Sequence, residues 1–372
     1  MKKINILQVK GTMNRGGAEE FLMNVLRKID SNKYSFIFLC YGNDKFDYEE
    51  EIITLGAKIV RIDDVKSHGP LKQIGKIREV IRNENIHVIH AHTYFNSVLS
   101  LIAGKREGVS VRIAHAHTSL KGNEAGPIKS IYASVSRKRI LKNATTLIAC
   151  GKEAGKAFYG TTNFKIIRNG IITENFSYNL HFRDSVRSAL GINKETTVIG
   201  HVGRITKPKN HKFILNVLDE YLKLNKDTLL VLVGDGPLRQ NLESRATLMK
   251  LSDNIKWLGT RDDVVKLYSM MDVLIFPSLW EGLPLTLVEA QVNGLAILAS
   301  DVIDTDVKFT NKLQQICLNV GPETWAKELF TMSEGNSRSI ISSNDSEYNI
   351  ITSVKKLTEL YDIAKDSGVY NE

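Results

Sequence analysis

Two glutamates separated by seven residues mark the segment with the clearest chemistry. Residues 276–290 read FPSLWEGLPLTLVEA, with Glu281 in a loop and Glu289 two turns into the helix that follows. Gly282 allows a ligand to approach the backbone, and the Leu285 and Thr286 amides at the helix start suit a phosphate. The Glu289 carboxylate can accept two hydrogen bonds from a ribose diol. These residue types suit a ligand with both phosphate and sugar hydroxyls.

A basic loop follows another expected strand. In HVGRITKPKNH (201–211), Gly203 allows a turn, and Arg204 and Lys209 come after it. A forked guanidinium and a compact ammonium together suit a diphosphate. Taken alone, the segment also fits a solvated basic surface loop.

Two glycines, Gly16 and Gly17, lie between the first expected strand and the first expected helix. A helix N-terminus there offers free N–H groups and the positive end of the helix dipole. The spacing matches neither the dinucleotide-binding fingerprint nor a Walker loop. A ligand-binding loop and a plain tight turn both remain open.

Four histidines end two other expected strands, as the pairs His90 and His92, and His115 and His117. A spacing of two places each pair on one side of its strand. A metal site is one reading, but the pairs lie on separate strands without a nearby carboxylate triad. We therefore favour one or two histidines that donate hydrogen bonds to a sugar hydroxyl or phosphate.

The elements that must position these residues are alternating strands and helices, which predict parallel, doubly wound sheets with ligand-binding loops at the strand ends. The first half predicts strands at 4–9, 35–40, 58–62, 87–90, 111–115, 146–149 and 165–167, and helices at 18–29, 72–82, 95–104, 128–141 and 152–158. The second half predicts strands at 197–201, 228–233, 254–258, 273–276 and 296–299, and helices at 210–224, 237–248, 262–270 and 285–292.

This pattern predicts two similar α/β domains whose strand-end loops face a cleft. We expect the boundary within the polar stretch 177–191. An amphipathic helix is expected at 348–364, and the segment 333–347 reads as a loop.

Charge is divided unevenly along the 372 residues, whose net charge is +9. Residues 1–190 hold 30 Lys/Arg and 17 Asp/Glu, or +13, and the remaining residues hold 20 and 24, or −4. The first half is thus expected to meet an anionic partner or to be a solvated basic surface. No zinc-finger spacing or RNP motif points to nucleic acid.

Residues 129–142 form the densest basic stretch, and Ile131, Tyr132 and Val135 share one face of the expected helix. That helix fits either an anionic bilayer or a crossover helix with its apolar face on the sheet. No apolar run is long enough to cross a bilayer, and no signal peptide is expected at the start. Cys40, Cys150 and Cys317 lack metal-ligand spacing and indicate reduced thiols in a cytoplasmic protein.

Over nearly its whole length the chain resembles retaining glycosyltransferases of the GT-B fold, in the large family 4 of capsular and exopolysaccharide synthesis. The motifs that carry the resemblance are Gly16-Gly17-Ala18-Glu19, His117, Asn169-Gly170, Gly203-Arg204 with Lys209, Gly234-Asp235-Gly236-Pro237, Pro277-Ser278 and the Glu281/Glu289 pair. The resemblance implies an acceptor-binding Rossmann-like domain at 1–180, a donor-binding one at 181–347, and a terminal helix within 348–372 that packs back on the first domain.

The family implies a role for each matching residue. Arg204 and Lys209 would neutralise the diphosphate of a nucleotide-sugar, most often UDP-linked in this family. The Leu285 and Thr286 amides would bind its terminal phosphate, and Glu289 the ribose. Glu281 with the backbone of Gly282 and Leu283 would hold the transferred sugar, and His117 would touch it. Gly259 and Arg261 would border the base, and Gly16 and Gly17 would line the diphosphate and acceptor side.

These roles imply transfer without a metal or other cofactor, because cationic side chains stabilise the leaving diphosphate. Since the family offers no obvious carboxylate nucleophile for a double displacement, front-face transfer is expected. The implied acceptor is a polyprenyl-diphosphate-linked saccharide. The resemblance also implies a cytoplasmic protein that is peripheral at the inner face of the cell membrane.

The chain departs from the family pattern at two places. Arg168 stands where proline usually precedes Asn-Gly, and residues 300–305 lack a glycine-rich turn. Two alternatives remain open: a sugar-nucleotide epimerase or phosphorylase of the same fold, and a non-catalytic nucleotide- or glycan-binding subunit.

Overall fold

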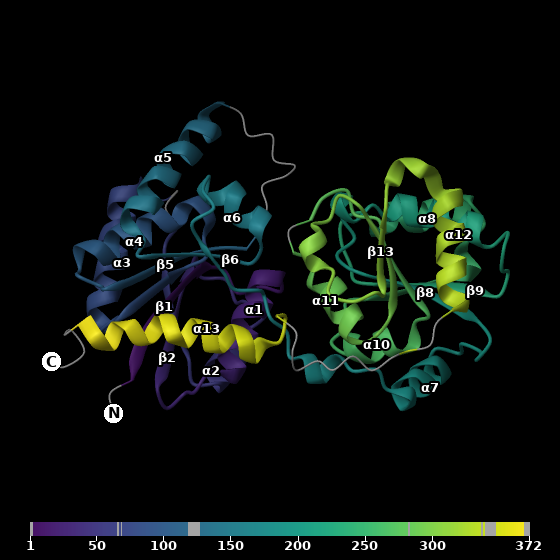
Figure 1. Cartoon of the computed structure of the whole chain (residues 1–372), viewed down its shortest axis with the longest axis horizontal. Coiled ribbons are helices and arrows are strands. Elements are labelled where there is room, and N and C mark those ends of the chain that lie inside the picture. The colour runs from purple at the N-terminus through teal and green to yellow at the C-terminus, as the bar shows by residue number, and fades with distance from the viewer. Residues whose placement is uncertain are drawn as a thin grey trace. The chain divides into compact units, whose positions relative to one another are not determined.

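The computed structural model describes residues 3–64, 67, 69–117, 127–281, 283–335, 338 and 347–367. The chain forms two compact units (Figure 1). Unit 1 comprises Met1–Ile171 and Glu347–Glu372, and unit 2 comprises Ile172–Ser346. The first division thus falls between residues 171 and 172, whereas the sequence placed it after residue 180.

Unit 1 is built on a parallel sheet whose described strands follow the order β3-β2-β1-β4-β5-β6-β7. The order reverses on either side of β1, as in doubly wound folds. Its strands are β1 Ile4–Gly11, β2 Tyr34–Tyr41, β3 Lys58–Ile62, β4 Val88–Ala91, β5 Val111–Ala116, β6 Thr146–Ala149 and β7 Lys165–Ile166. Its helices are α1 Gly17–Lys28, α2 Glu49–Thr54, α3 Gly69–Asn83, α4 Ser97–Arg106, α5 Pro127–Asn143, α6 Lys152–Tyr159 and α13 Ile350–Asp362.

The two faces of this sheet differ in chemistry, because side chains alternate along each strand. Leu7 and Ile89 face the apolar core beneath α3, α4 and α5. Gln8 and His90, which are partners in the β1–β4 register, face the other way with His115. Helices α1 and α13 cover that polar face (Figure 1).

Helix α13 follows unit 2 in the chain yet packs on α1 and β1 of unit 1, which confirms the expected return. Ile171 forms a parallel bridge with Asn349, and Tyr34 donates a hydrogen bond to Asp362 at 2.8 Å. A Cβ at Gly170 would lie 2.8 Å from the Ile350 Cα. The glycine before Ile171 is therefore required by the close approach of this helix.

Unit 2 repeats the plan with a parallel sheet in the order β10-β9-β8-β11-β12-β13. Its strands are β8 Thr197–Val202, β9 Thr228–Val233, β10 Ile255–Gly259, β11 Val273–Phe276, β12 Ala296–Ser300 and β13 Leu313–Ile316. Its helices are α7 Leu180–Ala189, α8 His211–Tyr221, α9 Arg239–Leu248, α10 Val264–Met270, α11 Leu285–Val292 and α12 Gly321–Glu334. Two doubly wound units confirm the predicted fold class.

Four elements were not predicted: α2, α7, α12 and β13. Helix α7 lies in the stretch expected to be a linker. Its Arg187 is buried by hydrogen bonds to the Met270 carbonyl at 3.0 Å and to Asp272 at 2.6 Å, so polar contacts anchor it. The buried residue of this helix is thus an arginine, which a search for apolar periodicity does not count. The expected loop at 333–347 lies largely outside the described residues.

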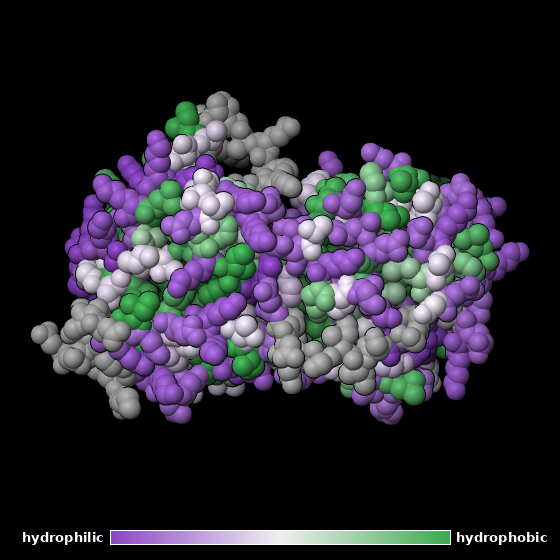
Figure 2. Space-filling model, viewed as in Figure 1, coloured by the Kyte–Doolittle hydropathy of each residue, from purple (hydrophilic) through white to green (hydrophobic). Residues whose placement is uncertain are grey.

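Helix α5 corrects one expectation. Ile131, Tyr132 and Val135 are 67%, 47% and 44% exposed, so this face does not pack on the sheet. Ser136 and Ile140 are the buried side chains instead. On the face shown in Figure 2, apolar residues occur in small groups among hydrophilic ones. None of the described helices combines the length and apolarity needed to cross a bilayer.

Candidate functional site

Three strand ends of unit 2 are joined by their backbones. The Gly203 amide donates to the Val233 carbonyl at 2.9 Å, and the Gly234 amide donates to the Gly259 carbonyl at 2.7 Å. Gly234 has a φ of +128°, and a Cβ there would fall well inside contact distance of the Gly203 carbonyl oxygen. Only glycine fits such a position. The loops after β8, β9 and β10 are thus fixed against one another.

An ion pair joins the basic loop to the glutamate loop. The Lys209 ammonium lies 2.8 Å from a Glu281 carboxylate oxygen, and the two side chains are 17% and 14% exposed. The ammonium also lies 4.5 Å from the centre of the Phe276 ring, at the end of β11. A Cβ at Gly203 would lie 3.2 Å from the Lys209 Cε, so this glycine leaves room for the lysine. The structure therefore brings together two residues that the sequence places 72 positions apart.

Arg204 differs from Lys209 in its surroundings. Its side chain is exposed, and within the described parts of the chain no carboxylate forms an ion pair with it. Its carbonyl accepts a hydrogen bond from the Thr206 amide at 2.8 Å, which holds the backbone of the loop. An exposed guanidinium on a fixed backbone is suited to an anionic ligand.

Glu289 is oriented by a residue that the sequence analysis did not single out. The Tyr268 hydroxyl, from α10, donates to a Glu289 carboxylate oxygen at 2.7 Å. Burial, followed by the charge of Glu289, raises the pKa of Tyr268 well above its usual value. The hydroxyl therefore remains a donor at neutral pH. No sequence signal distinguishes Tyr268 from any other aromatic residue of a helix.

Helix α11 begins at Leu285, and Pro284 at its N-cap makes no side-chain capping bond. The Leu287 amide bonds back to Pro284 at 3.0 Å. The start of this helix, with Leu285 and Thr286, carries the positive end of a helix dipole. Leu283 precedes it and is partly buried. Gly282, expected to hold the sugar, lies outside the described residues.

The residues expected near the base lie at the end of β10. Gly259 has a φ of +65°, in the region that favours glycine. Arg261 forms an exposed, two-pronged ion pair with Asp263, with both N–O distances 2.8 Å. Such a pair contributes little to stability, so it leaves Arg261 able to exchange partners.

Two further histidines lie behind the basic loop. His201 is fully buried, and its Nδ1 lies 2.9 Å from the Ile275 carbonyl oxygen, so Nδ1 carries the proton. The His211 ring stands at 81° to it, with 4.6 Å between centroids. Burial, with a smaller contribution from Lys209, lowers the pKa of His211 to about 4. In the sequence, these two histidines could be noticed only because positions 201 and 211 are the two ends of the basic motif.

His117 lies in unit 1, and both of its ring nitrogens face protein groups. Nδ1 is 3.0 Å from Asn169 Oδ1, and Nε2 is 2.7 Å from His92 Nδ1. Burial lowers the pKa of His117 to about 3. A hydrogen bond from this ring to a sugar would have to replace one of these contacts. The predicted contact with the donor sugar remains a prediction.

Gly16 and Gly17 lie at the start of α1, which begins at Gly17. Gly16 is the N-cap in an extended conformation, and a Cβ there would lie 2.5 Å from a Glu19 carboxylate oxygen. Glu19 in turn pairs with Lys10 of β1 at 2.5 Å. A Cβ at Gly17 would meet nothing within 4 Å. A larger residue at 16 would have to displace the end of the Glu19 side chain, whereas the space at 17 is open.

Comparison with known families assigns each half of the chain. Residues 15–175 match the model described as Glycosyltransferase Family 4, and residues 182–337 match that described as Glycosyl transferases group 1. The putative glycosyltransferase EpsF of Bacillus subtilis (strain 168) is 37% identical over 308 residues, covering 81% of this chain and 80% of EpsF. A UDP-Gal:alpha-D-GlcNAc-diphosphoundecaprenol alpha-1,3-galactosyltransferase of Escherichia coli is 23% identical, covering 96% and 97%.

Solved structures show the same fold at low identity. HepE from Anabaena, crystallised in complex with UDP, superimposes with a TM-score of 0.80 at 18% identity and covers 96% of this chain and 99% of its own. WaaG, a glycosyltransferase involved in lipopolysaccharide biosynthesis, gives a TM-score of 0.66 at 15% identity over 98% of both chains.

Proposed function

Because the chain belongs to the glycosyltransferases of group 1 and family 4, we propose that it transfers a sugar from a nucleoside-diphosphate sugar to a saccharide acceptor in surface-polysaccharide synthesis. The observation that carries this proposal is the joined loop set of unit 2. There Arg204, Lys209 and Glu281 lie at interlocked strand ends, and Tyr268 orients Glu289.

We propose UDP as the nucleotide of the donor. The support comes from HepE, which binds UDP, and from the E. coli relative, whose name specifies UDP-Gal. In this chain Arg204 and Lys209 would hold the diphosphate, and the start of α11 its terminal phosphate. Glu289 would accept the ribose hydroxyls, and Glu281 the hydroxyls of the transferred sugar.

The chemistry follows from where charge develops. Breaking the bond between the anomeric carbon and the diphosphate leaves negative charge on the diphosphate, and donors already in place stabilise it. Arg204, Lys209 and the α11 dipole supply that charge without a divalent ion. We propose that the transfer retains the anomeric configuration by a front-face route, in which the diphosphate helps to deprotonate the acceptor hydroxyl. A covalent sugar–protein adduct trapped during turnover would contradict this route.

We propose that the acceptor is linked to a polyprenyl diphosphate and that unit 1 meets the membrane through α5. The exposed face of α5 combines Ile131, Tyr132 and Val135 with Lys138 and Arg139. Residues 127–143 contain no acidic residue. Each basic side chain near an anionic bilayer contributes about 1 kcal/mol, and the apolar side chains add burial in the interface.

Nucleotide-dependent thermal unfolding tests the donor site. A ligand at 100 times its dissociation constant stabilises the folded state by about 2.7 kcal/mol, which raises the melting temperature measurably. We expect a shift with UDP that exceeds those with GDP and ADP, and its loss in Glu289→Ala. Glu323→Gln is the matched control, because Glu323 is an exposed glutamate of the same unit. No shift with any nucleotide would favour a non-catalytic subunit instead.

Vesicle sedimentation tests the membrane contact. Binding to vesicles with anionic lipid should decrease with salt, and Lys138→Glu with Arg139→Glu should weaken it without altering the UDP shift. Binding that ignores lipid charge and salt would remove this part of the proposal.

A further inference from the structure

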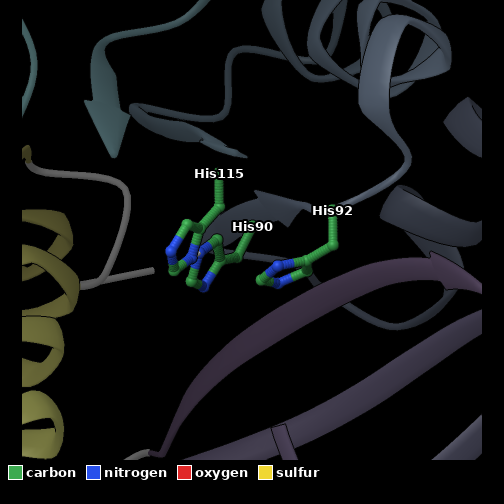
Figure 3. A group of neighbouring side chains, drawn as sticks. All are labelled: His90, His92 and His115. Carbon is green, nitrogen blue, oxygen red and sulfur yellow. Dashed lines mark hydrogen bonds between the residues drawn. The ribbon is translucent and has the colours of Figure 1, made fainter. Parts of the chain in front are cut away.

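Four histidines form a compact cluster on the polar face of the unit 1 sheet. His90 and His92 come from β4 and the residue after it, and His115 and His117 come from β5 and the residue after it. Within each pair the ring centroids lie 4.1 and 4.0 Å apart. Figure 3 shows the side chains of His90, His92 and His115 gathered at one place on the sheet. The sequence placed the pairs on separate strands, and the sheet makes those strands neighbours.

Nitrogen atoms of different rings meet in the middle of this cluster. His90 Nε2 lies 3.1 Å from His115 Nδ1, and His92 Nδ1 lies 2.7 Å from His117 Nε2. One nitrogen from each of His90, His92 and His115 can be chosen so that all lie within 4.8 Å of one another. The three side chains are at most 6% exposed. The cluster is therefore both close enough and dry enough to hold an ion.

The outer nitrogens of three rings face oxygen atoms. His92 Nε2 lies 2.9 Å from Gln8 Oε1, His117 Nδ1 lies 3.0 Å from Asn169 Oδ1, and His90 Nδ1 lies 2.8 Å from the Tyr361 hydroxyl. Amide oxygens accept and never donate. The outer nitrogens of His92 and His117 must then carry the protons. This is the pattern around metal-binding histidines, whose second nitrogen donates to a fixed oxygen.

Counting protons shows what the middle of the cluster lacks. The row Gln8, His92, His117, Asn169 contains three contacts, and each contact needs one proton. Two neutral imidazoles supply two protons, and both are used on the amide oxygens. The lone pairs of His92 Nδ1 and His117 Nε2 would then face each other at 2.7 Å, an arrangement that a cation bound to both nitrogens, either a proton or a metal ion, would stabilise.

We propose that His90, His92 and His115, with His117 as a fourth ligand, form a binding site for a divalent transition-metal ion of the Zn²⁺ or Co²⁺ type. Neutral imidazoles are preferred ligands for these ions, and sites with three histidines are well known for zinc. His115 Nε2 is buried and, within the described residues, has no hydrogen-bond partner, so one nitrogen of this ring can take a new partner without losing a hydrogen bond.

This ion lies in unit 1 and has no part in neutralising the donor diphosphate in unit 2. Its place between β4, β5 and Tyr361 of α13 points to a structural role. The ion would hold the returning helix to the sheet through the hydrogen bond between His90 and Tyr361. The proposal is independent of the donor chemistry, and its test needs no turnover.

Metal titration of the full chain, purified without a histidine tag and stripped with chelator, tests the site. We expect one Zn²⁺ per chain by calorimetry, a raised melting temperature, and the visible absorption of four-coordinate Co²⁺. His115→Gln and His92→Asn should each abolish the Co²⁺ spectrum. Gln8→Leu, which removes an outer oxygen, should weaken binding 10- to 100-fold. His201→Gln removes a buried histidine of unit 2 and should leave binding unchanged.

Two results would overturn the proposal. Zn²⁺ binding that survives in both ligand variants would place the ion on other histidines. Nitrogen-15 shifts that show a shared proton between His92 and His117, unchanged by added metal, would mean that a proton is the cation. The proposal would also fail if the Asn169 amide nitrogen is found to donate to His117. The two imidazole protons would then satisfy the two remaining contacts of the row.

Discussion

The histidine cluster of unit 1 and the loop set of unit 2 both lie at strand ends in two similar sheets, yet they are built in opposite ways. In unit 1 the polar rings are buried, and all but one of their eight ring nitrogens face another protein group. In unit 2 the loops carry full charges, Arg204 is exposed, and the backbone does the positioning.

This difference determines how each region responds to a ligand. A side chain whose hydrogen bonds are already made inside the protein must break one of them to bind substrate, at a cost of about 1–3 kcal/mol. An exposed charged side chain on a fixed loop, such as Arg204, loses only its hydration. The loop set is therefore suited to a ligand that comes and goes, and the histidine cluster to one that stays.

The largest expected effect is a loss of catalytic activity, and it concerns the loop set of unit 2. Arg204→Ala should reduce kcat/KM about 100- to 1,000-fold, because the leaving diphosphate loses a charged donor in the transition state. Lys207→Ala, on the same loop and also exposed, should change it less than about threefold. The measurement is initial rate of sugar transfer at several donor concentrations. Equal losses in both variants would show that the loop acts only through its net charge.

The next effect tests whether backbone contacts hold the loop set. Gly234→Ala combines a forbidden φ with a clash against the Gly203 carbonyl, so it should destabilise unit 2 by about 3 kcal/mol. Gly191→Ala is the control, because Gly191 has a φ of +64° and open space around its Cβ position. It should cost only about 1 kcal/mol. All three tryptophans of the chain lie in unit 2, at positions Trp257, Trp280 and Trp325. Urea unfolding followed by tryptophan fluorescence therefore reports on this unit.

The smallest effect concerns acid. The folded pKa of His211 is about 4, below the unfolded value of about 6.5, so the unfolded state binds more protons between these pH values. Stability is therefore present above pH 6.5 and is lost as the pH falls toward 4. From pH 7 to 5 this group should account for about 2 kcal/mol of the loss in unit 2.

His211→Gln should remove that part of the acid dependence, measured by urea unfolding at each pH with tryptophan fluorescence. His201 and Lys209 face the same ring and are retained in the variant. An unchanged pH dependence would mean that His211 binds protons equally in the folded and unfolded states.

The strand predictions are confirmed because buried parallel strands produce short β-branched runs. Such runs can be recognised without knowing which strands are neighbours in the sheet. The strands 58–62, 146–149, 228–233 and 273–276 and the helix 285–292 match at both ends. Helix α7 was read as a linker because its anchor, Arg187, is held by carbonyls and Asp272 that are distant in sequence. For α5 the sequence left open whether the apolar face meets a bilayer or packs on the sheet, and the structure exposes this face.

The sequence by itself determined the alternating elements, the two-unit plan and the identity of the charged loop residues, because periodicity and glycine placement are local properties. Which of these residues come into contact depends on the tertiary structure. In the folded chain Lys209 forms an ion pair with Glu281, Tyr268 donates a hydrogen bond to Glu289, and four histidines from two strands form one cluster. The physical reason is that strand order and register fix long-range neighbours, and no local pattern contains that order.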